Sequence, residues 1–269
     1  MDLTNNLMKA IYVSHSVKGS FRTIRSLSKY HNNGFKTINL EFKNGSRFES
    51  VNLGTAWMLT NYYYWSKRFD CFDPSDLKIL NEIGQQIYLK LEKKFKTWRN
   101  GLWGLLGTHG IVFMMVRKFK PETIIETGIA HGYSAEIILM ALSLNGRGRL
   151  KSIDIDQKVH IEDIEVDVGW VVSPSLRDRW DVMIEDSKVL LDTMTDKPDI
   201  FIHDSLHTED HMLFEYSWAK NHLKTNGFLI SDDIDRNRAW QIFHTTNKDF
   251  KEYLKTPTTG VSQKLIQKH

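Results

Sequence analysis

The chain has 269 residues, of which 41% are hydrophobic, 26% charged and 12% aromatic. This composition supports a sizeable buried core and excludes a wholly disordered protein. The single cysteine, Cys71, excludes an internal disulfide and a multi-cysteine zinc site, and it favours a reducing compartment. The apolar run over residues 111–116 is too short to span a bilayer, and the N-terminus lacks the pattern of a signal peptide. We therefore expect a soluble cytoplasmic protein.

Charge is distributed unevenly along the chain. Residues 1–120 contain 19 Lys and Arg against 8 Asp and Glu, a net charge of +11, whereas residues 121–269 contain 17 against 25, a net charge of −8. This asymmetry predicts two units: an N-terminal extension over residues 1–110 and a main domain over residues 111–269. The basic segment either provides a solvated face or helps to bind an anionic substrate. No recognised nucleic-acid-binding motif is present.

The front segment mixes strands and helices. Residues 36–53 alternate apolar and polar side chains around Asn44-Gly45, which predicts a β-hairpin. The aromatic run over residues 62–65 is typical of a core, with a stacking wall for a flat or sugar-like ligand as the alternative. An apolar stripe predicts an amphipathic helix over residues 75–98, and the glycine-rich stretch over residues 101–110 predicts a loop or a close helix contact.

After residue 120 strands and helices alternate. We expect strands at residues 123–126, 150–155, 181–184, 200–203 and 228–231, with helices over residues 134–144 and from Thr208 to Leu223. We expect a helix over residues 238–254 and an antiparallel closing strand over residues 261–266. This rhythm predicts an α/β fold with a doubly wound, mostly parallel sheet.

Polar residues follow every one of the five predicted parallel strands. Because ligands bind beyond the carboxyl ends of such strands, these residues define one candidate cleft. They are Glu126 to Gly128, Asp154 and Asp156, Asp186 and Ser187, Asp204 to His207, and Asp232 with Asp233.

The turn after the first strand contains Gly128 and Gly132, which allow a tight turn and a close approach to a ligand. The pattern is not the G-x-G-x-x-G of dinucleotide sites. A carboxylate at the end of the second strand can accept both hydroxyls of a ribose, and Asp154 and Asp156 compete for this role on one face of the strand.

The segments IIETGIAHGYSAEIIL, LKSIDID, VMIEDSKVLL and DIFIHDSLHTEDHMLFEYSWAKNHLKTNGFLISDD resemble class I S-adenosylmethionine-dependent methyltransferases. The resemblance covers residues 121–240, and its last block is similar to O-methyltransferases of small molecules and glycan sugars. It implies the following cofactor contacts: Glu126, Gly128, Gly132 and Ser134 around the methionine part, Asp154 on the ribose, and Asp186 and Ser187 beside the adenine. The resemblance also favours Asp154 over Asp156.

Metal-dependent members of that family place a carboxylate after the fourth strand and a pair after the fifth. Asp204, Asp232 and Asp233 lie at these positions, and hard oxygen ligands suit Mg²⁺. We therefore expect a divalent metal that lowers the pKa of the acceptor hydroxyl, with Asp204 as a catalytic residue. The alternative is that Asp232 and Asp233 only cap a helix and bind substrate.

His207 lies on the loop after the fourth strand and is the candidate general base, because neutral imidazole titrates near working pH. A supporting or helix-start role is the alternative. His211, one helical turn later, fits either role. We interpret His131 as a cofactor-loop contact and His203 as a structural residue.

Together these features predict an O-methyltransferase that acts on a small-molecule or sugar-containing acceptor. If this acceptor is anionic, the basic front segment would help to bind it. We expect residues 1–110 to form a lid or wall over the acceptor. The alternatives are a nicotinamide-dependent oxidoreductase, a non-catalytic binding protein on the same fold, and a nucleic-acid methyltransferase. The sequence leaves a homo-oligomer open and gives no indication of a membrane partner.

Overall fold

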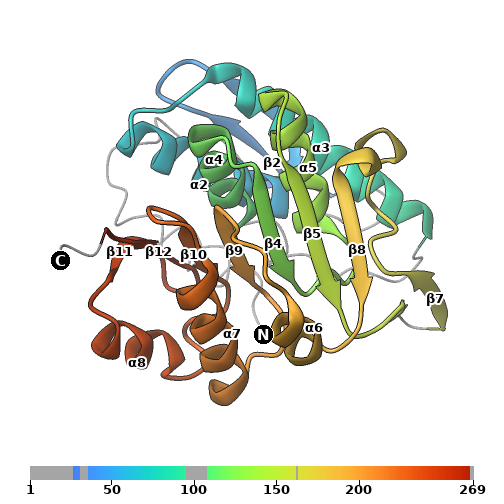
Figure 1. Cartoon of the computed structure of the whole chain (residues 1–269). Helices are drawn as coiled ribbons and strands as arrows, with labels where there is room; N and C mark the ends of the chain where they lie inside the picture. The colour runs from blue at the N-terminus through green and yellow to red at the C-terminus, as the bar shows by residue number, and fades with distance from the viewer. Residues whose placement is uncertain (1–26, 31–35, 95–107, 162, 267–269) are drawn as a thin grey trace. The chain divides into compact units, whose positions relative to one another are not determined.

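The computed structural model describes residues 27–30, 36–94, 108–161 and 163–266 of the chain (Figure 1). The chain divides into two compact units, Met1–Met114 and Met115–His269. Helix α4 (His109–Phe119) contains the boundary between them.

The first unit contains a three-stranded antiparallel sheet and two long helices. Its elements are β1 (Leu27–Tyr30), β2 (Lys36–Glu41), β3 (Arg47–Asn52), α2 (Leu53–Arg68) and α3 (Pro74–Lys94). Strands β2 and β3 form a hairpin in which Gly45 has a φ of +87°, a conformation that glycine adopts without a steric penalty. The Asn52 side chain accepts a hydrogen bond from the Thr55 backbone and caps α2.

The core of the first unit is aromatic and aliphatic. Tyr62 and Tyr63 of α2 are buried, and the Tyr62 hydroxyl donates a hydrogen bond to the buried Asp76 at 2.8 Å. One side of α3 buries the stripe that the sequence predicts, which comprises Leu80, Ile83, Ile87 and Leu91. Residues 95–98 of the expected helix and 101–107 of the glycine-rich stretch lie outside the described residues.

The second unit is built on a seven-stranded sheet in the order β11-β12-β10-β9-β4-β5-β8, which Figure 1 shows side by side. The parallel strands are β4 (Thr123–Thr127), β5 (Arg149–Asp154), β8 (Trp180–Ile184), β9 (Ile200–His203) and β10 (Phe228–Ser231). Strands β11 (Phe250–Lys255) and β12 (Gly260–Lys264) continue the sheet antiparallel. The predicted α/β class and mostly parallel, doubly wound sheet are confirmed. The strand order reverses between β4 and β9.

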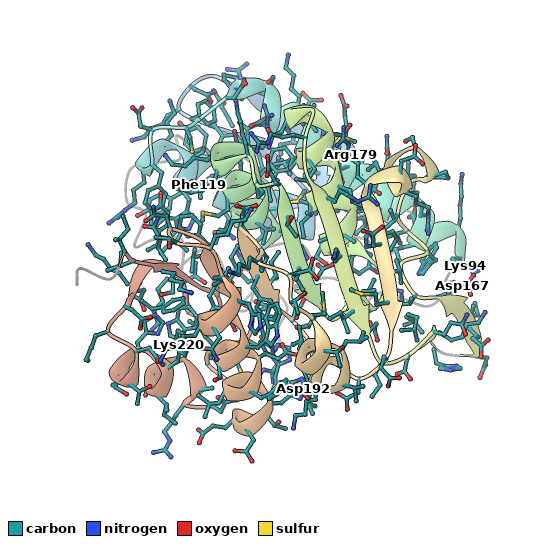
Figure 2. The ribbon with its side chains drawn as sticks, in the orientation of Figure 1. Lys94, Phe119, Asp167, Arg179, Asp192 and Lys220 are labelled. Carbon is teal, nitrogen blue, oxygen red and sulfur yellow. The ribbon has the colours of Figure 1, made fainter. Side chains whose placement is uncertain are left out.

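Helices cover this sheet. They are α5 (Tyr133–Asn145), the 3-10 helix η2 (Pro174–Arg179), α6 (Ser187–Thr193), α7 (Glu209–His222) and α8 (Ala239–Thr246). At the end of α4, the Phe119 ring lies 4.4 Å from the ring of Phe228, centroid to centroid (Figure 2). None of the helices in the described residues is long and apolar enough to cross a bilayer.

Side chains alternate between the two faces of each strand. Ile125, Phe201 and Leu229 belong to the buried cluster that packs on α6, α7 and α8. Thr127 and His203 lie two residues further along their strands, so they extend this same face to the carboxyl edge. Glu126 lies on the opposite face.

The prediction of a helix over residues 238–254 is wrong beyond Thr246, because β11 begins at Phe250. Asn247 ends the helix, and its side chain donates a hydrogen bond to the Phe243 carbonyl. The buried pair Phe250 and Leu254 explains the error: a spacing of four residues fits one face of a helix and one face of a strand equally well. Strands β6 (Lys158–Ile161) and β7 (Ile164–Asp167) form a further hairpin, which was not predicted from the sequence; its last residue, Asp167, is labelled in Figure 2.

Candidate functional site

The turn after β4 is held in a conformation that only glycine fits. Gly128 and Gly132 have φ values of +87° and +86°. A β-carbon on Gly128 would lie 1.9 Å from the Asp204 carbonyl oxygen, and one on Gly132 would lie 2.8 Å from the Gly169 α-carbon. The turn therefore packs directly against the end of β9, where the strand order reverses and ligands of such sheets bind.

Asp154, at the end of β5, shapes the same turn. Its Oδ2 atom accepts hydrogen bonds from the backbone of Ile129 at 2.8 Å and of Ala130 at 2.9 Å, and its Oδ1 atom accepts one from Asp156 at 3.1 Å. Since a carboxylate has about four acceptor positions, one remains for a ligand hydroxyl. Asp156 is exposed. Asp154 thus braces the turn, and a role at the ribose stays a prediction for both residues.

Glu126 is completely buried one residue before Thr127. Its Oε2 atom accepts a 2.7 Å hydrogen bond from Ser152, whose hydroxyl in turn accepts one from the Trp180 indole. Its Oε1 atom is buried and has no hydrogen-bond partner among the described residues. Burial raises the pKa of Glu126 to about 7, and the hydroxyls of Ser134 and Ser152 offset this only in part. A buried acceptor atom without a hydrogen-bond donor suits a ligand that supplies a donor group.

The turn is braced from a second side by residues 168–173, which the sequence analysis did not single out. The Gly169 backbone donates to the Ala130 carbonyl at 2.8 Å. The Trp170 indole donates to Nδ1 of His131 at 2.8 Å. Burial lowers the pKa of His131 to about 4, so this imidazole is neutral at pH 7 and its Nδ1 can accept. His131 is therefore part of the turn's support.

Asp186 and Ser187 begin α6. The Asp186 side chain caps this helix by accepting from the Lys188 backbone at 2.8 Å. The Ser187 hydroxyl is buried and donates to Glu215 at 2.7 Å. These bonds give both residues structural roles, and their expected place beside the adenine stays a prediction.

The acidic residues after β9 and β10 influence one another. The pKa of Asp204 is raised well above its usual range by burial and by the nearby carboxylates of Asp232, Glu126 and Asp233. Asp233 has a φ of +48° and accepts a hydrogen bond from Arg236 at 3.0 Å. Within the described ranges, no three His, Cys, Asp or Glu side chains are arranged as a metal site.

His207 lies beside Asp204, with 3.7 Å between its Nε2 atom and Oδ1 of the aspartate. This Nε2 atom is buried and has no hydrogen-bond partner in the part of the chain that the structure describes. Burial, and after it the nearby His203, lowers the pKa of His207, so the imidazole is neutral at pH 7. A neutral imidazole with an unpaired nitrogen can accept a proton from a bound hydroxyl.

Glu215 of α7 is the main residue that sequence reasoning missed. It is completely buried and accepts hydrogen bonds from five side chains of β4, α6, α7 and the β9 end. His203, which we interpreted as structural, donates to it through Nδ1 at 2.5 Å. The one signal in the sequence is the spacing of four residues from His211, which places both side chains on one helix face.

The described contacts bring several of the predicted residues to one edge of the sheet. The Gly128 turn touches the Asp204 backbone, Asp154 braces that turn, and Asp204 interacts electrostatically with Glu126. In the comparison with known proteins, residues 125–234 match a family model described as a methyltransferase domain.

Solved structures of other methyltransferases are similar in fold to this chain. A methyltransferase from Geobacter sulfurreducens superposes with a TM-score of 0.50 at 14% identity, covering 68% of this chain and 90% of that one. The O-methyltransferase TomG from Streptomyces achromogenes, in complex with S-adenosylmethionine, gives 0.47 at 13% identity, covering 68% and 89%. The S-adenosylhomocysteine-bound methyltransferase PaMTH1 from Podospora anserina gives 0.48 at 13% identity, covering 69% and 88%. No curated protein matches the sequence significantly.

Proposed function

We propose that the protein is an S-adenosylmethionine-dependent O-methyltransferase that methylates a hydroxyl of a small molecule or glycan intermediate. The observation that carries this proposal is the contact of Gly128 with the Asp204 carbonyl, across the point where the strand order reverses. This contact puts a turn suited to a nucleoside cofactor next to a loop with an acid and a neutral imidazole.

The residues around the turn fit the cofactor. Glu126 offers a buried oxygen without a donor, which suits the ammonium group of the methionine part. Asp154 keeps about one acceptor position for a ribose hydroxyl. Gly128 and Gly132 adopt the positive φ values that the tight turn requires. S-adenosylmethionine, when bound, supplies a methyl group activated by a positively charged sulfur.

The chain's own contribution is mainly positioning. Holding two reactants in line can supply about 7–11 kcal/mol of a barrier, so a nucleophilic side chain is not required. We assign the proton of the acceptor hydroxyl to Nε2 of His207, the unpaired nitrogen of a neutral imidazole. Asp204, whose raised pKa favours its protonated form, can donate a hydrogen bond to the acceptor oxygen.

The metal assistance that the sequence predicts is not part of the proposal. The oxygen ligands of Asp204, Asp232 and Asp233 suit Mg²⁺ chemically, and a divalent cation would relieve the repulsion that raises the Asp204 pKa. The side chains as they stand do not fit a three-ligand site, because no such group occurs in the described residues and Asp233 is bound to Arg236. The proposed transfer therefore has no step that depends on a metal. We expect methyl transfer to be unchanged after chelation and without added Mg²⁺, and a loss of activity on chelation that Mg²⁺ restores would contradict this.

The acceptor class is supported by charge. The net charge of +11 over residues 1–120 favours an anionic acceptor, such as a sugar that carries a phosphate or a carboxylate. A panel of neutral and anionic hydroxyl compounds, assayed with the radiolabelled methyl donor at low and high salt, tests this preference. We expect the anionic compounds to react faster, and their advantage to shrink as salt screens the charges.

Calorimetry with the full-length protein tests the proposed function directly. We expect S-adenosylmethionine and S-adenosylhomocysteine to bind and NAD to give no heat of binding. Binding of NAD with no affinity for either sulfur nucleoside would replace the proposal with the oxidoreductase alternative.

A further inference from the structure

Glu215 is the centre of a hydrogen-bond network beneath the carboxyl edge of the sheet. Both its oxygens are used. Oε1 accepts from Ser187 at 2.7 Å, from Ser205 at 2.9 Å and from Nε2 of His211 at 2.9 Å, and Oε2 accepts from Thr127 at 2.6 Å and from Nδ1 of His203 at 2.5 Å.

Each donor is a neighbour of a candidate site residue. Thr127 immediately precedes Gly128, and Ser187 immediately follows Asp186. His203 and Ser205 flank Asp204 on both sides. His211 lies four residues after His207, in the first turn of α7. One buried carboxylate thus ties together the backbone segments that carry the proposed cofactor and acceptor groups.

The network also requires the carboxylate to be ionised. Burial alone would raise the pKa of Glu215, but hydrogen bonds from His203, His211 and Thr127 outweigh burial and lower it far below its usual range. An ionised carboxylate can only accept, so each partner must donate. This fixes the hydrogen on Nδ1 of His203 and on Nε2 of His211, two different tautomers set by the same side chain.

A second observation separates this network from ordinary core packing. The Nε2 atom of His203 is buried and has no hydrogen-bond partner among the described residues. The His203 ring lies 5.2 Å from the ring of His207, centroid to centroid, at an angle of 73°. The tautomer of His203 therefore decides whether a donor or an acceptor is presented beside the proposed base.

We propose that Glu215 is the positioning residue of the transfer site, holding Thr127, Ser187, His203, Ser205 and His211 so that the site is assembled before ligands bind. The inference rests on the proposed methyl transfer. Glu215 itself does not contact substrate in this proposal, and it acts through the five side chains that donate hydrogen bonds to it. Binding to a preassembled site avoids the cost of ordering these segments.

The test uses the full-length protein and S-adenosylhomocysteine as the probe. In E215Q the amide group turns one acceptor oxygen into a donor that faces other donors, so at least one hydrogen bond is lost and a tautomer can switch. The matched control is Y216F, which removes the buried 2.6 Å hydrogen bond between Tyr216 and Ser231 on the next residue of the same helix. Both variants lower the unfolding temperature, but only E215Q disturbs the site.

We expect E215Q to bind S-adenosylhomocysteine at least about tenfold more weakly than the native protein, which is about 1.4 kcal/mol, while Y216F stays within about twofold. Unchanged affinity and unchanged methyl-transfer rate in a folded E215Q would overturn the inference. Equal losses in the two variants would also overturn it, since they would indicate general destabilisation.

Two further measurements apply even if E215Q does not fold. Nitrogen-15 NMR of the native protein must find the hydrogen on Nδ1 of His203 and on Nε2 of His211, and the reverse pair contradicts the network. H203N keeps an amide donor near the Nδ1 position, whereas H203Q places it near Nε2, so we expect H203N to bind the probe more tightly. A native protein that shows these tautomers but does not bind the probe refutes the proposed function and not the network.

Discussion

The α-carbon of Gly128 lies so close to the carbonyl oxygen of Asp204 that a β-carbon would be only 1.9 Å from it. This contact joins the first and fourth strands of the parallel series at their carboxyl ends, where β4 and β9 are neighbours. It links two segments that lie 76 positions apart in the sequence: the turn proposed to bind the cofactor and the loop proposed to bind the acceptor. Any side chain at position 128 must displace the Asp204 backbone.

Replacement of Gly128 by alanine is therefore expected to destabilise the protein strongly. The new methyl group combines a left-handed backbone conformation with a backbone clash, and we expect a loss of more than about 3 kcal/mol and no detectable cofactor binding. Gly146 is the matched control, because its φ of +68° is also left-handed but nothing beyond its chain neighbours lies within 4 Å of the place that a β-carbon would take. We expect G146A to lose about 1 kcal/mol. Chemical denaturation measures the free energy of unfolding of both variants. Similar losses of stability would mean that the contact with Asp204 is unimportant.

The side chain of Asp154 accepts hydrogen bonds from the backbone of the glycine turn, whereas that of Asp156 is exposed. This difference predicts different effects when each side chain is removed. D154A leaves two backbone donors of the glycine turn without their acceptor, so we expect at least about a tenfold loss of affinity for S-adenosylhomocysteine, and a loss of about 1–3 kcal/mol in stability. D156A removes an exposed side chain and is expected to keep native stability. Calorimetry and thermal unfolding of both variants decide which aspartate serves the ribose.

Residues 121–240 of the sequence carried most of the information about the fold. The alternating apolar strands and their capping residues predicted β4, α5, β5, β8, β9, α7 and β10, because each has a period or a turn signal of its own. The end of the chain was harder to predict, because the spacing of Phe250 and Leu254 fits both a helix and a strand. The pairing of β11 with β12 in the sheet favours the strand.

The site could be predicted only where function follows from position at a strand end. Gly128, Asp154 and Asp204 are candidates that this reasoning predicts. Glu215 lies in the middle of a helix, and nothing local distinguishes it from a surface glutamate until three other segments fold against it. Trp170 was missed for the same reason, since its hydrogen bond to His131 joins residues 39 positions apart.

Glu126 predicts a specific pH dependence of stability. Its folded pKa of about 7 lies above its ordinary value of 4.5, so folding favours the protonated form. The stabilising contribution is complete below about pH 4.5 and is lost as the pH rises to 7, by an amount on the order of 3 kcal/mol. We expect E126Q, which cannot ionise, to lack this component. Urea denaturation of both proteins between pH 5 and 8 measures the difference, and parallel curves would count against a buried, ionisable Glu126.

His131 predicts the opposite dependence. Its folded pKa of about 4 is below the ordinary 6.5, so the neutral form is favoured, and the contribution to stability is present above pH 6.5 and lost as the pH falls to 4. Protonation of Nδ1 must also break the hydrogen bond from Trp170. The difference in tryptophan fluorescence between the native protein and W170F should therefore change with a midpoint near pH 4. A midpoint near 6.5 would indicate that the ring is exposed to solvent.

Removal of the imidazole of His207 is expected to lower the rate of methyl transfer without weakening cofactor binding. The Nε2 atom lies beside Asp204 and takes no part in the hydrogen bonds that brace the cofactor turn, so H207Q should keep the affinity for S-adenosylhomocysteine within about twofold. Loss of a general base lowers kcat by about 10²–10⁴-fold, and we expect a decrease in this range with the KM for the methyl donor little changed. H160Q, on the exposed strand β6, serves as the control and should keep the native rate. A kcat for H207Q equal to that of H160Q would exclude His207 as the base and leave the proton of the acceptor to another group at this edge.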